Sequence, residues 1–259
     1  MDLGLRGRKA IVCASSRGLG RGCATALAAE GVDVVINGRD AAHLEQVAEE
    51  IRKATGATVI AVAADVGTRE GQESLLAACP APDILVNNNA GPPFRDFREL
   101  DREKLLAGVV SNFVTPIELI QRVIDGMVAR KFGRIVNITS SSVKAPLGGL
   151  DLSSGARAGL TAFLKGVSQS VAGSNVTINN ILPGSFDTDR LRSGQERSAK
   201  QRNVDVATIR AENAAKIPAR RFGTPEEFGA ACAFLCSSQA GYITGQNLLI
   251  DGGVFPGAF

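Results

Sequence analysis

Short runs of branched apolar residues alternate along this chain with longer segments of helical pattern, and no other feature constrains the fold as strongly. The runs are continuously apolar, as expected of parallel strands covered by helices on both faces. The segments between them are long enough for crossover helices. We therefore predict an α/β fold with a single doubly wound, seven-stranded parallel sheet. The predicted strands are Lys9–Cys13, Val32–Asn37, Thr58–Ala63, Asp83–Asn87, Arg134–Thr139, Val176–Leu182 and Asn247–Asp251.

One segment interrupts the tight alternation. Residues 185–219, between the sixth strand and a helix that begins near Thr224, form a long polar stretch of helical pattern. The chain has 259 residues, 44% of them apolar, which suits one large core. It contains no internal repeat and no linker-like segment. We predict one domain over residues 1–259, with an insertion over the sheet at about 185–219.

Composition disfavours several classes of partner. The 29 basic and 26 acidic residues give a net charge of +3, too small and too evenly spread for a nucleic-acid surface. No apolar run approaches the roughly 20 residues of a membrane helix, and residues 1–8 lack the apolar stretch of a signal peptide. The five cysteines are scattered, which argues against a disulfide framework. We expect a cytoplasmic protein that binds neither nucleic acid nor membrane.

Residues that commonly act as acids, bases or metal ligands are scarce. The chain has one histidine, His43, one tyrosine, Tyr242, and no tryptophan. His43 falls on the helix after the second strand, and we predict that it is a surface residue far from the chemistry. Cys232 and Cys236 are four residues apart on an apolar helix, which is more typical of core thiols than of a metal site. Mechanisms that begin with a histidine base are therefore disfavoured.

A turn of small residues directly follows the first strand. It reads Ala14-Ser15-Ser16-Arg17-Gly18-Leu19-Gly20 and leads into a helix-prone stretch. Gly18 and Gly20 would let a phosphate approach the backbone, and the helix N-terminus offers free N–H groups and a favourable dipole. The same pattern also occurs in ordinary strand-to-helix connections, so alone it leaves nucleotide binding open.

The motifs along the whole chain resemble the classical short-chain dehydrogenase/reductase family, and within it the 3-oxoacyl-(acyl carrier protein) reductases. The family's Thr-Gly-x-x-x-Gly-x-Gly turn matches residues 13–20, with Cys13 and Ala14 at its first two positions. Residues 83–88, 183–184, 221–227, 242–246 and 251–253 match further family motifs in order. The resemblance implies a Rossmann fold, a nicotinamide cofactor and an oxidoreductase activity.

The resemblance also implies which residues contact the cofactor. After the fourth strand the family usually reads Asn-Asn-Ala-Gly, whereas this chain reads Asn87-Asn88-Asn89-Ala90-Gly91. Either one asparagine is inserted, or Asn89 and Ala90 replace the usual small pair. The implied cofactor contacts are Ser16, Arg17, Gly18, Leu19, Gly20, Arg39, Asp65, Val66, Asn88, Asn89, Ala90, Arg157, Pro183, Gly184 and Thr188.

The choice of cofactor can be argued from charge. NADP differs from NAD by a 2′-phosphate, which needs positive charge and rejects a carboxylate at the end of the second strand. That strand ends in Ile36-Asn37-Gly38-Arg39, which has no acid, and Arg17 lies in the glycine turn. We predict NADP(H). The alternative is that Arg17 and Arg39 are solvated surface charges.

The expected catalytic residues match the family only in part. In similar enzymes a tyrosine protonates the substrate oxygen, a lysine one helical turn later lowers the pKa of that tyrosine, a serine orients the substrate and an asparagine holds a water. Ser140 and Asn112 fall on the serine and asparagine positions. Ser153 and Arg157 fall on those of the tyrosine and lysine. We predict an atypical active site of Asn112, Ser140, Ser153 and Arg157.

This substitution changes the chemistry that is available. A serine hydroxyl is a weaker acid than a phenol and reaches less far, and arginine stays protonated. Arg157 could still hold the nicotinamide ribose and stabilise an alkoxide while water or Ser140 supplies the proton. Lys144 and Asp151 are other candidates for the acid, or else solvated loop charges.

The insertion corresponds to the substrate lid of similar enzymes. Its basic residues would either attract a phosphate-bearing carrier, coenzyme A or acyl carrier protein, or be ordinary solvated charge. Relatives commonly form tetramers through the helices after the fourth and fifth strands and through the C-terminal segment, so we expect a homotetramer. The basic residues are Arg190, Arg192, Arg197, Lys200 and Arg202.

Two functional hypotheses follow. The first is an NADP(H)-dependent reductase of a ketone or 3-oxoacyl carbonyl, favoured by Ser140, Asn112 and the lid. The second is an NADP(H)-binding pseudoenzyme that acts as a sensor or assembly partner, favoured by Ser153 and Arg157. We favour the enzyme, because a protein that only binds nucleotide has no evident need for the rest of a substrate site.

Overall fold

The computed structural model describes residues 2–258 and confirms the doubly wound, seven-stranded parallel sheet. The strand order is β3-β2-β1-β4-β5-β6-β7, and every neighbouring pair is parallel. Each predicted strand is present, with its ends shifted by one residue at most. The strands are β1 Lys9–Val12, β2 Asp33–Gly38, β3 Val59–Ala63, β4 Ile84–Asn87, β5 Gly133–Ile138, β6 Val176–Pro183 and β7 Asn247–Ile250.

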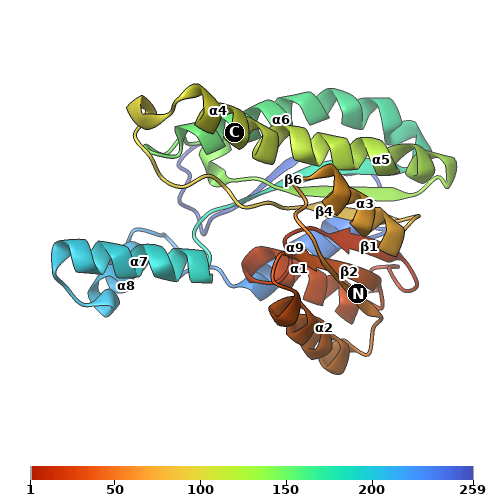
Figure 1. Ribbon diagram of the computed structural model, residues 1–259, viewed down its shortest axis with the longest axis horizontal. Coiled ribbons are helices and arrows are strands. Elements are labelled where there is room, and N and C mark those ends of the chain that lie inside the picture. Colours follow the sequence, from red (N-terminus) through yellow and green to blue (C-terminus); the bar gives the residue numbers. More distant parts are fainter. Residues whose placement is uncertain (1, 259) are drawn as a thin grey trace.

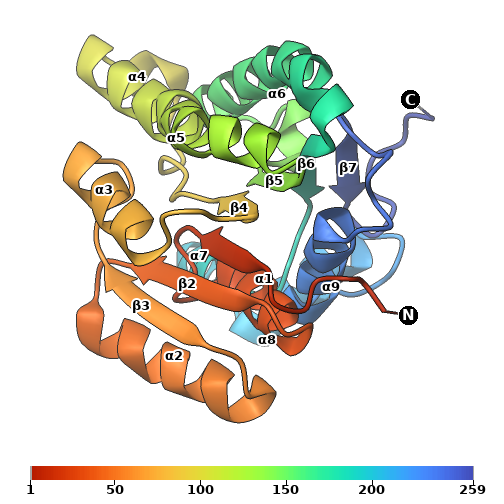
Figure 2. The ribbon, with the colours of Figure 1, turned by 90° about the vertical axis from the view of Figure 1, so that its right-hand side faces the viewer.

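Helices cover both faces of the sheet (Figure 2). One face carries α1 Gly18–Ala29, α2 Ala41–Thr55 and α9 Pro225–Cys236. The other carries α3 Arg69–Ala78, α4 Arg102–Val109, α5 Thr115–Ala129 and α6 Asp151–Val171. Two apolar clusters fill the spaces between the sheet and these layers. The central strands β4 and β5 are buried along their whole length and are largely apolar, because both of their faces are covered.

Short helical turns complete the body of the protein. They are the 3₁₀ turns η1 Phe97–Glu99, η3 Ser141–Val143 and η4 Ala172–Ser174, and the π turn η2 Val110–Val114 that joins α4 to α5. No helix within residues 2–258 is long and apolar enough to cross a membrane. The described residues also contain no group of three or more histidine, cysteine or acidic side chains that could hold a metal ion.

The contact between α1 and α9 brings two backbones together. A Cβ added to Gly22 on α1 would lie 2.2 Å from the Pro225 carbonyl oxygen, so only glycine allows this approach. Cys232 and Cys236 on α9 are fully buried, and both belong to the core as predicted. Hydrogen bonding with Cys23 and burial raise the pKa of Cys232. These thiols are therefore part of the packing.

The segment after β6 leaves the body of the protein. It forms α7 Asp189–Arg202 and α8 Val206–Ala215, which pack on each other and project as an arm from the carboxyl edge of the sheet (Figure 1). The chain then returns beside its point of departure, where Phe186 and Gly223 form an isolated parallel bridge. The arm therefore stands next to the edge where the strands of a doubly wound sheet place ligands.

Candidate active site

The glycine turn between β1 and α1 is shaped by close backbone contacts. A Cβ on Gly20 would lie 2.4 Å from the Ala14 carbonyl oxygen and 2.9 Å from Asn88 Nδ2, so a side chain is excluded there. Gly18 has φ +55°, and Ala14 has φ 43°, a left-handed conformation that glycine adopts at lower cost. No side chain caps α1 at Arg17. The turn thus presents open backbone and a helix N-terminus, which fits the pyrophosphate of a dinucleotide.

Asn37 at the end of β2 holds this turn in place. Its side-chain oxygen accepts from Ala14 N at 3.1 Å, and its Nδ2 donates to the carbonyls of Val62 and Ala64 at 3.1 and 2.9 Å. The Ser15 hydroxyl accepts from Asn37 N at 2.9 Å. Asn37 is buried, so it positions the turn rather than contacting a ligand. The sequence indicated only that no acid stands here.

Two arginines and the histidine surround the adenosine end of the turn. Arg17 and Arg39 are exposed, and neither forms a salt bridge within residues 2–258. We predicted that His43 is a surface residue far from the nicotinamide end, and the structure places it against the other end of the site. Its side chain is half-buried, with Nε2 3.2 Å from the Ser16 carbonyl oxygen, because α2 packs its first turn against the glycine turn. Motif comparison gave no signal for this contact.

The remaining predicted cofactor contacts lie along the same edge. Asn88 Nδ2 donates to the Ala14 carbonyl at 3.0 Å, and Asn89 Nδ2 donates to the Ser111 carbonyl at 3.3 Å. Asn88 therefore joins β4 to the glycine turn, whereas Asn89 contacts the π turn η2. Asp65 is exposed and Val66 is buried at the end of β3, on the adenine side.

The segment after β6 faces the glycine turn. Thr188 caps α7, and its Cγ2 lies 3.4 Å from the place that a Cβ on Gly18 would occupy. Gly184 N donates to the Ile250 carbonyl at 2.8 Å, which fixes Pro183 and Gly184 against β7. Leu19 packs on the core. The predicted pyrophosphate and nicotinamide contacts thus lie next to one another at this edge of the sheet.

Arg157 is a buried charged residue at this edge. It lies on α6 with 8% of its surface exposed, and Nη1 donates to the Ile138 carbonyl at 2.6 Å and Nε to Ser153 Oγ at 3.2 Å. No carboxylate within residues 2–258 pairs with it. Burial, with a smaller contribution from Arg190, lowers the pKa of Arg157 to about 10, so it remains charged at neutral pH. A buried charge without a counter-ion is costly for the fold.

Asn112 lies beside Arg157 in the π turn η2. The side chain is buried and donates to the Gly108 carbonyl at 3.2 Å, while its Oδ1 has no protein partner among the described residues. Asn112 and Arg157 line a cavity of about 20 Å³, which has room for roughly one water molecule. The other lining residues are Asn87, Asn88, Asn89, Ser111, Thr115, Pro116, Leu119, Asn137, Ile138 and Leu160.

Ser140 follows β5 and begins the turn η3. Its Oγ accepts from Ser142 N at 3.1 Å and lies 2.9 Å from Ser142 Oγ, which donates to it. These two bonds occupy its acceptor sites and leave its own proton free to be donated. Ser140 does not line the small cavity. It is two residues beyond Ile138, whose carbonyl holds Arg157.

The other candidate acids lie outside this group. Asp151 is exposed and accepts from Gly149 N at 3.2 Å, and Lys144 Nζ lies 5.3 Å from the centroid of the Phe255 ring. Tyr242 is fully exposed in the segment before β7, where the neighbouring Thr244 accepts from Ile178 N near the start of β6. This is the amino edge of the sheet. The only tyrosine of the chain is therefore remote from Arg157 and Ser140.

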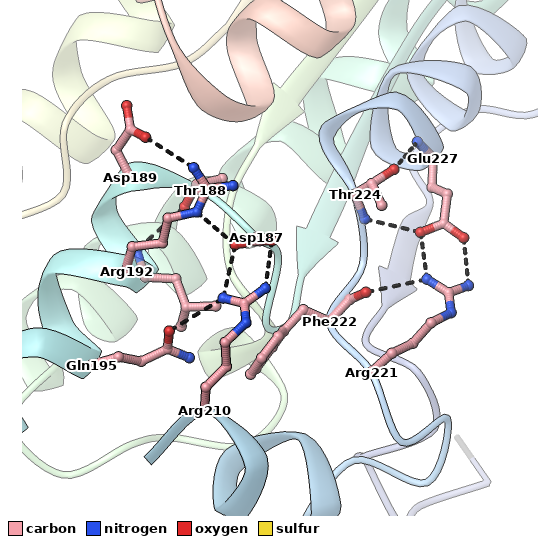
Figure 3. Close-up of polar contacts among 11 residues, drawn as sticks. Asp187, Thr188, Asp189, Arg192, Gln195, Arg210, Arg221, Phe222, Thr224 and Glu227 are labelled. Atoms are coloured by element: carbon pink, nitrogen blue, oxygen red, sulfur yellow. Dashed lines mark hydrogen bonds and ion pairs between the residues drawn. The ribbon is translucent and has the colours of Figure 1, made fainter. Parts of the chain in front are cut away.

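An ion network anchors the projecting arm (Figure 3). Asp187 accepts from Arg210 at 2.6 and 3.1 Å and from Arg192 at 2.9 Å, and these bonds lower the pKa of Asp187 to about 2. Arg202 pairs with Glu212 across the two helices. Two of the five basic lid residues are therefore neutralised internally, while Arg190, Arg197 and Lys200 form no salt bridge within the described chain.

Below the arm, a second polar contact holds the start of α9. Arg221 forms two hydrogen bonds with the Glu227 carboxylate, and Glu227 completes a capping box with Thr224 (Figure 3). The helix that we predicted to begin near Thr224 begins at Pro225. The family-like motif at residues 221–227 thus has a local structural reason, because its acid and its arginine satisfy each other.

The fold and the glycine turn define a doubly wound dinucleotide-binding protein whose candidate site lies at the carboxyl ends of β1, β4, β5 and β6. Comparison with known proteins identifies its family. The family model described as enoyl-(acyl carrier protein) reductase matches residues 13–255. The chain belongs to the short-chain dehydrogenase/reductase family, among members similar to 3-oxoacyl-(acyl carrier protein) reductases.

Similar proteins cover nearly the whole chain. The NADPH-dependent reductase BacG of Bacillus subtilis (strain 168) is 34% identical over 95% of this chain and 97% of its own length. The 3-oxoacyl-[acyl-carrier-protein] reductase FabG of Aquifex aeolicus (strain VF5) is 32% identical over 98% of this chain and 100% of its own. The structure of L-sorbose reductase from Gluconobacter frateurii with NADPH and L-sorbose has a TM-score of 0.94 at 29% identity, covering 99% and 100% of the two chains.

Proposed function

We propose that this protein is an NADP(H)-dependent reductase of a ketone or 3-oxoacyl-type carbonyl, with an atypical active site. Ser153 and Arg157 occupy the positions of the tyrosine and lysine of similar enzymes. The observation that carries the proposal is the buried, unpaired guanidinium of Arg157 beside Asn112 at the carboxyl edge of the sheet. The substrate is a small carbonyl compound, free or carried on coenzyme A or acyl carrier protein.

Cofactor binding is assigned to the whole cleft. Gly18, Leu19 and Gly20 offer backbone to the pyrophosphate, and Ser16, Arg17 and Arg39 face the 2′-phosphate. The NADPH dependence of BacG and the NADPH-bound L-sorbose reductase support the choice of NADP(H). The adenine, ribose and nicotinamide contacts are assigned to Asp65, Val66, Asn88, Asn89, Ala90, Arg157, Pro183, Gly184 and Thr188.

When bound in this cleft, NADPH supplies the hydride that adds to the carbonyl carbon. Negative charge then develops on the substrate oxygen, which must receive a proton to give the alcohol. Ser140 donates its hydroxyl proton in a hydrogen bond to that oxygen, because Ser142 already occupies its acceptor sites. The fixed charge of Arg157 stabilises the oxyanion in a low-dielectric site. Ser140 regains its proton from solvent, so that each reduction consumes one NADPH and one solvent proton.

The alternative is an NADP(H)-binding pseudoenzyme that acts as a sensor or assembly partner. A specific contact favours it. Arg157 is held by the Ile138 carbonyl and by Ser153, and a guanidinium held in this way does not release a proton at neutral pH. In this reading the cleft binds the cofactor and no group completes the reduction.

The two functions are separated by NADPH oxidation assays on ketones, diketones and 3-oxoacyl thioesters. The natural protein is run beside a Ser153→Tyr/Arg157→Lys double variant, which restores the usual pair. Turnover of any of these compounds by the natural protein supports the reductase. Activity confined to the double variant would favour the pseudoenzyme, since it would show an intact site that lacks its acid.

We also propose that the chain is one domain, acts in the cytoplasm and assembles as a homotetramer. The five cysteines are free and buried, which supports a reducing location. Large apolar side chains remain exposed on the helices after β4 and β5, which supports assembly through these elements. They are Leu105, Leu106, Val109 and Val110 near η2 and Phe163 on α6.

A further inference from the structure

Arg190 lies at the base of the projecting arm, against the loop that follows β4. Its Nη2 lies 3.4 Å from the Pro92 carbonyl oxygen, and a Cβ on Gly91 would lie 3.0 Å from its Nη1. The preceding residue, Ala90, accepts from Ser111 Oγ at 3.3 Å. Ser111 in turn lines the same small cavity as Arg157. One loop therefore connects the arginine on the arm to the buried arginine at the site.

The charges around this loop are not balanced. Neither Arg157 nor Arg190 forms a salt bridge within residues 2–258, and no acidic residue lines the cavity. On the same arm, Arg192, Arg202 and Arg210 are all paired with carboxylates. Arg157 and Arg190 are close enough for the second to lower the pKa of the first. Arg157 is buried and Arg190 is exposed, so solvent screens part of their repulsion, but two neighbouring positive charges without a paired carboxylate still favour binding of an anion.

We propose that Arg190 binds a carboxylate carried by the substrate itself, so that the preferred substrate is an oxo acid rather than a neutral ketone. This inference rests on the site of the proposed reductase. The fork of a guanidinium matches a carboxylate or a phosphate. The position decides between them: Arg190 contacts the loop whose first residues, Asn88 and Asn89, line the cavity, whereas a phosphate on a carrier would bind further out on the arm. Arg197 lies in this outer part of the arm, seven residues or about 10 Å beyond Arg190 along α7.

Arg197 also supplies the matched control. Like Arg190 it is an arginine on α7 without a salt bridge in the described chain, but it lies away from the β4 loop. Arg190→Gln and Arg197→Gln therefore remove the same charge from the same helix. Both are compared with the natural protein in calorimetric titrations of the NADP⁺-loaded protein with acetoacetate and with methyl acetoacetate, a pair that differs in charge. NADPH oxidation is measured with the same compounds.

The natural protein and Arg197→Gln should bind the acid at least tenfold more tightly than the ester. Arg190→Gln should lose most of this preference by weakening binding of the acid alone. The proposal is overturned if the natural protein shows no preference, if the preference survives in Arg190→Gln, or if Arg197→Gln removes it, which would indicate a carrier phosphate. Binding is measured without turnover, so the two failures can be told apart: loss of the acid preference refutes the role of Arg190, whereas an acid preference without NADPH oxidation on any compound refutes the reductase and leaves Arg190 as an anion-binding residue only.

Discussion

At the scale of single residues, two buried arginines illustrate opposite uses of the same side chain. Arg134 on β5 is 1% exposed, and its guanidinium donates to the carbonyls of Ser237, Gly133 and Asn175. Arg157 is also buried but donates to one carbonyl and one hydroxyl. Arg134 joins three segments of the fold. Arg157 keeps hydrogen-bonding capacity in reserve, as expected of a residue placed to meet a ligand.

Replacing each of these arginines by methionine should therefore have different effects on stability. Arg134→Met leaves several carbonyls unpaired and should lower the free energy of unfolding by about 3–5 kcal/mol. Arg157→Met removes an uncompensated charge along with fewer bonds, so its cost should be smaller by roughly 2 kcal/mol. Urea unfolding of the two variants measures the difference. Equal losses would mean that Arg157 is a structural residue.

At the scale of elements, the strands were predictable because parallel strands buried on both faces are mostly apolar. The positions of Ser140 and Arg157 could also be predicted from the sequence, because Ser140 follows the end of strand β5 and Arg157 lies on helix α6. Contacts between elements were not predictable. His43 touches Ser16, and Arg190 reaches Gly91, through packing of segments that are distant in sequence. The left-handed φ of Ala14 was likewise missed, although the glycine that the family motif has at this position is a signal for it.

The arm formed by α7 and α8 should loosen in acid. Arg210 and Arg192 lower the pKa of Asp187 to about 2. The stability that this pair contributes is therefore present above the ordinary carboxyl pKa of about 4 and is lost as the pH falls toward 2. Asp187→Asn should speed hydrogen exchange in α7 and α8 at neutral pH and weaken the acid dependence, of which the Arg202–Glu212 pair keeps a part. Asp205→Asn, an exposed acid on the same arm, is the control. Unchanged exchange in Asp187→Asn would show that other contacts hold the arm.

At the scale of the whole molecule, the candidate site is formed by segments that follow different strands of the sheet. The glycine turn after β1 faces the segment after β6, and the arm projects from the same edge (Figure 1). Apolar side chains on α4, η2 and α6 are exposed within residues 2–258. The proposed assembly would therefore use a surface other than the cofactor site.

Assembly through the helices after β4 and β5 can be tested with single charges. Leu106→Glu should convert the tetramer to smaller species in light scattering, because burying a carboxylate in an apolar interface is costly. Ile60→Glu, at the exposed edge strand β3, should leave the tetramer intact. A natural protein that is monomeric at micromolar concentration would contradict the proposed assembly.

The most direct test of the central claim is transfer of deuterium from NADPH labelled at C4 of the nicotinamide in a single turnover. Protein in excess over the labelled cofactor is mixed with the oxo acids and ketones used above, and the alcohol is analysed by mass spectrometry. The account predicts deuterium on the carbinol carbon with the natural protein and at least a hundredfold slower transfer with Arg157→Met. Tight binding of NADPH without transfer to any compound would contradict it and leave a protein that only holds the nucleotide.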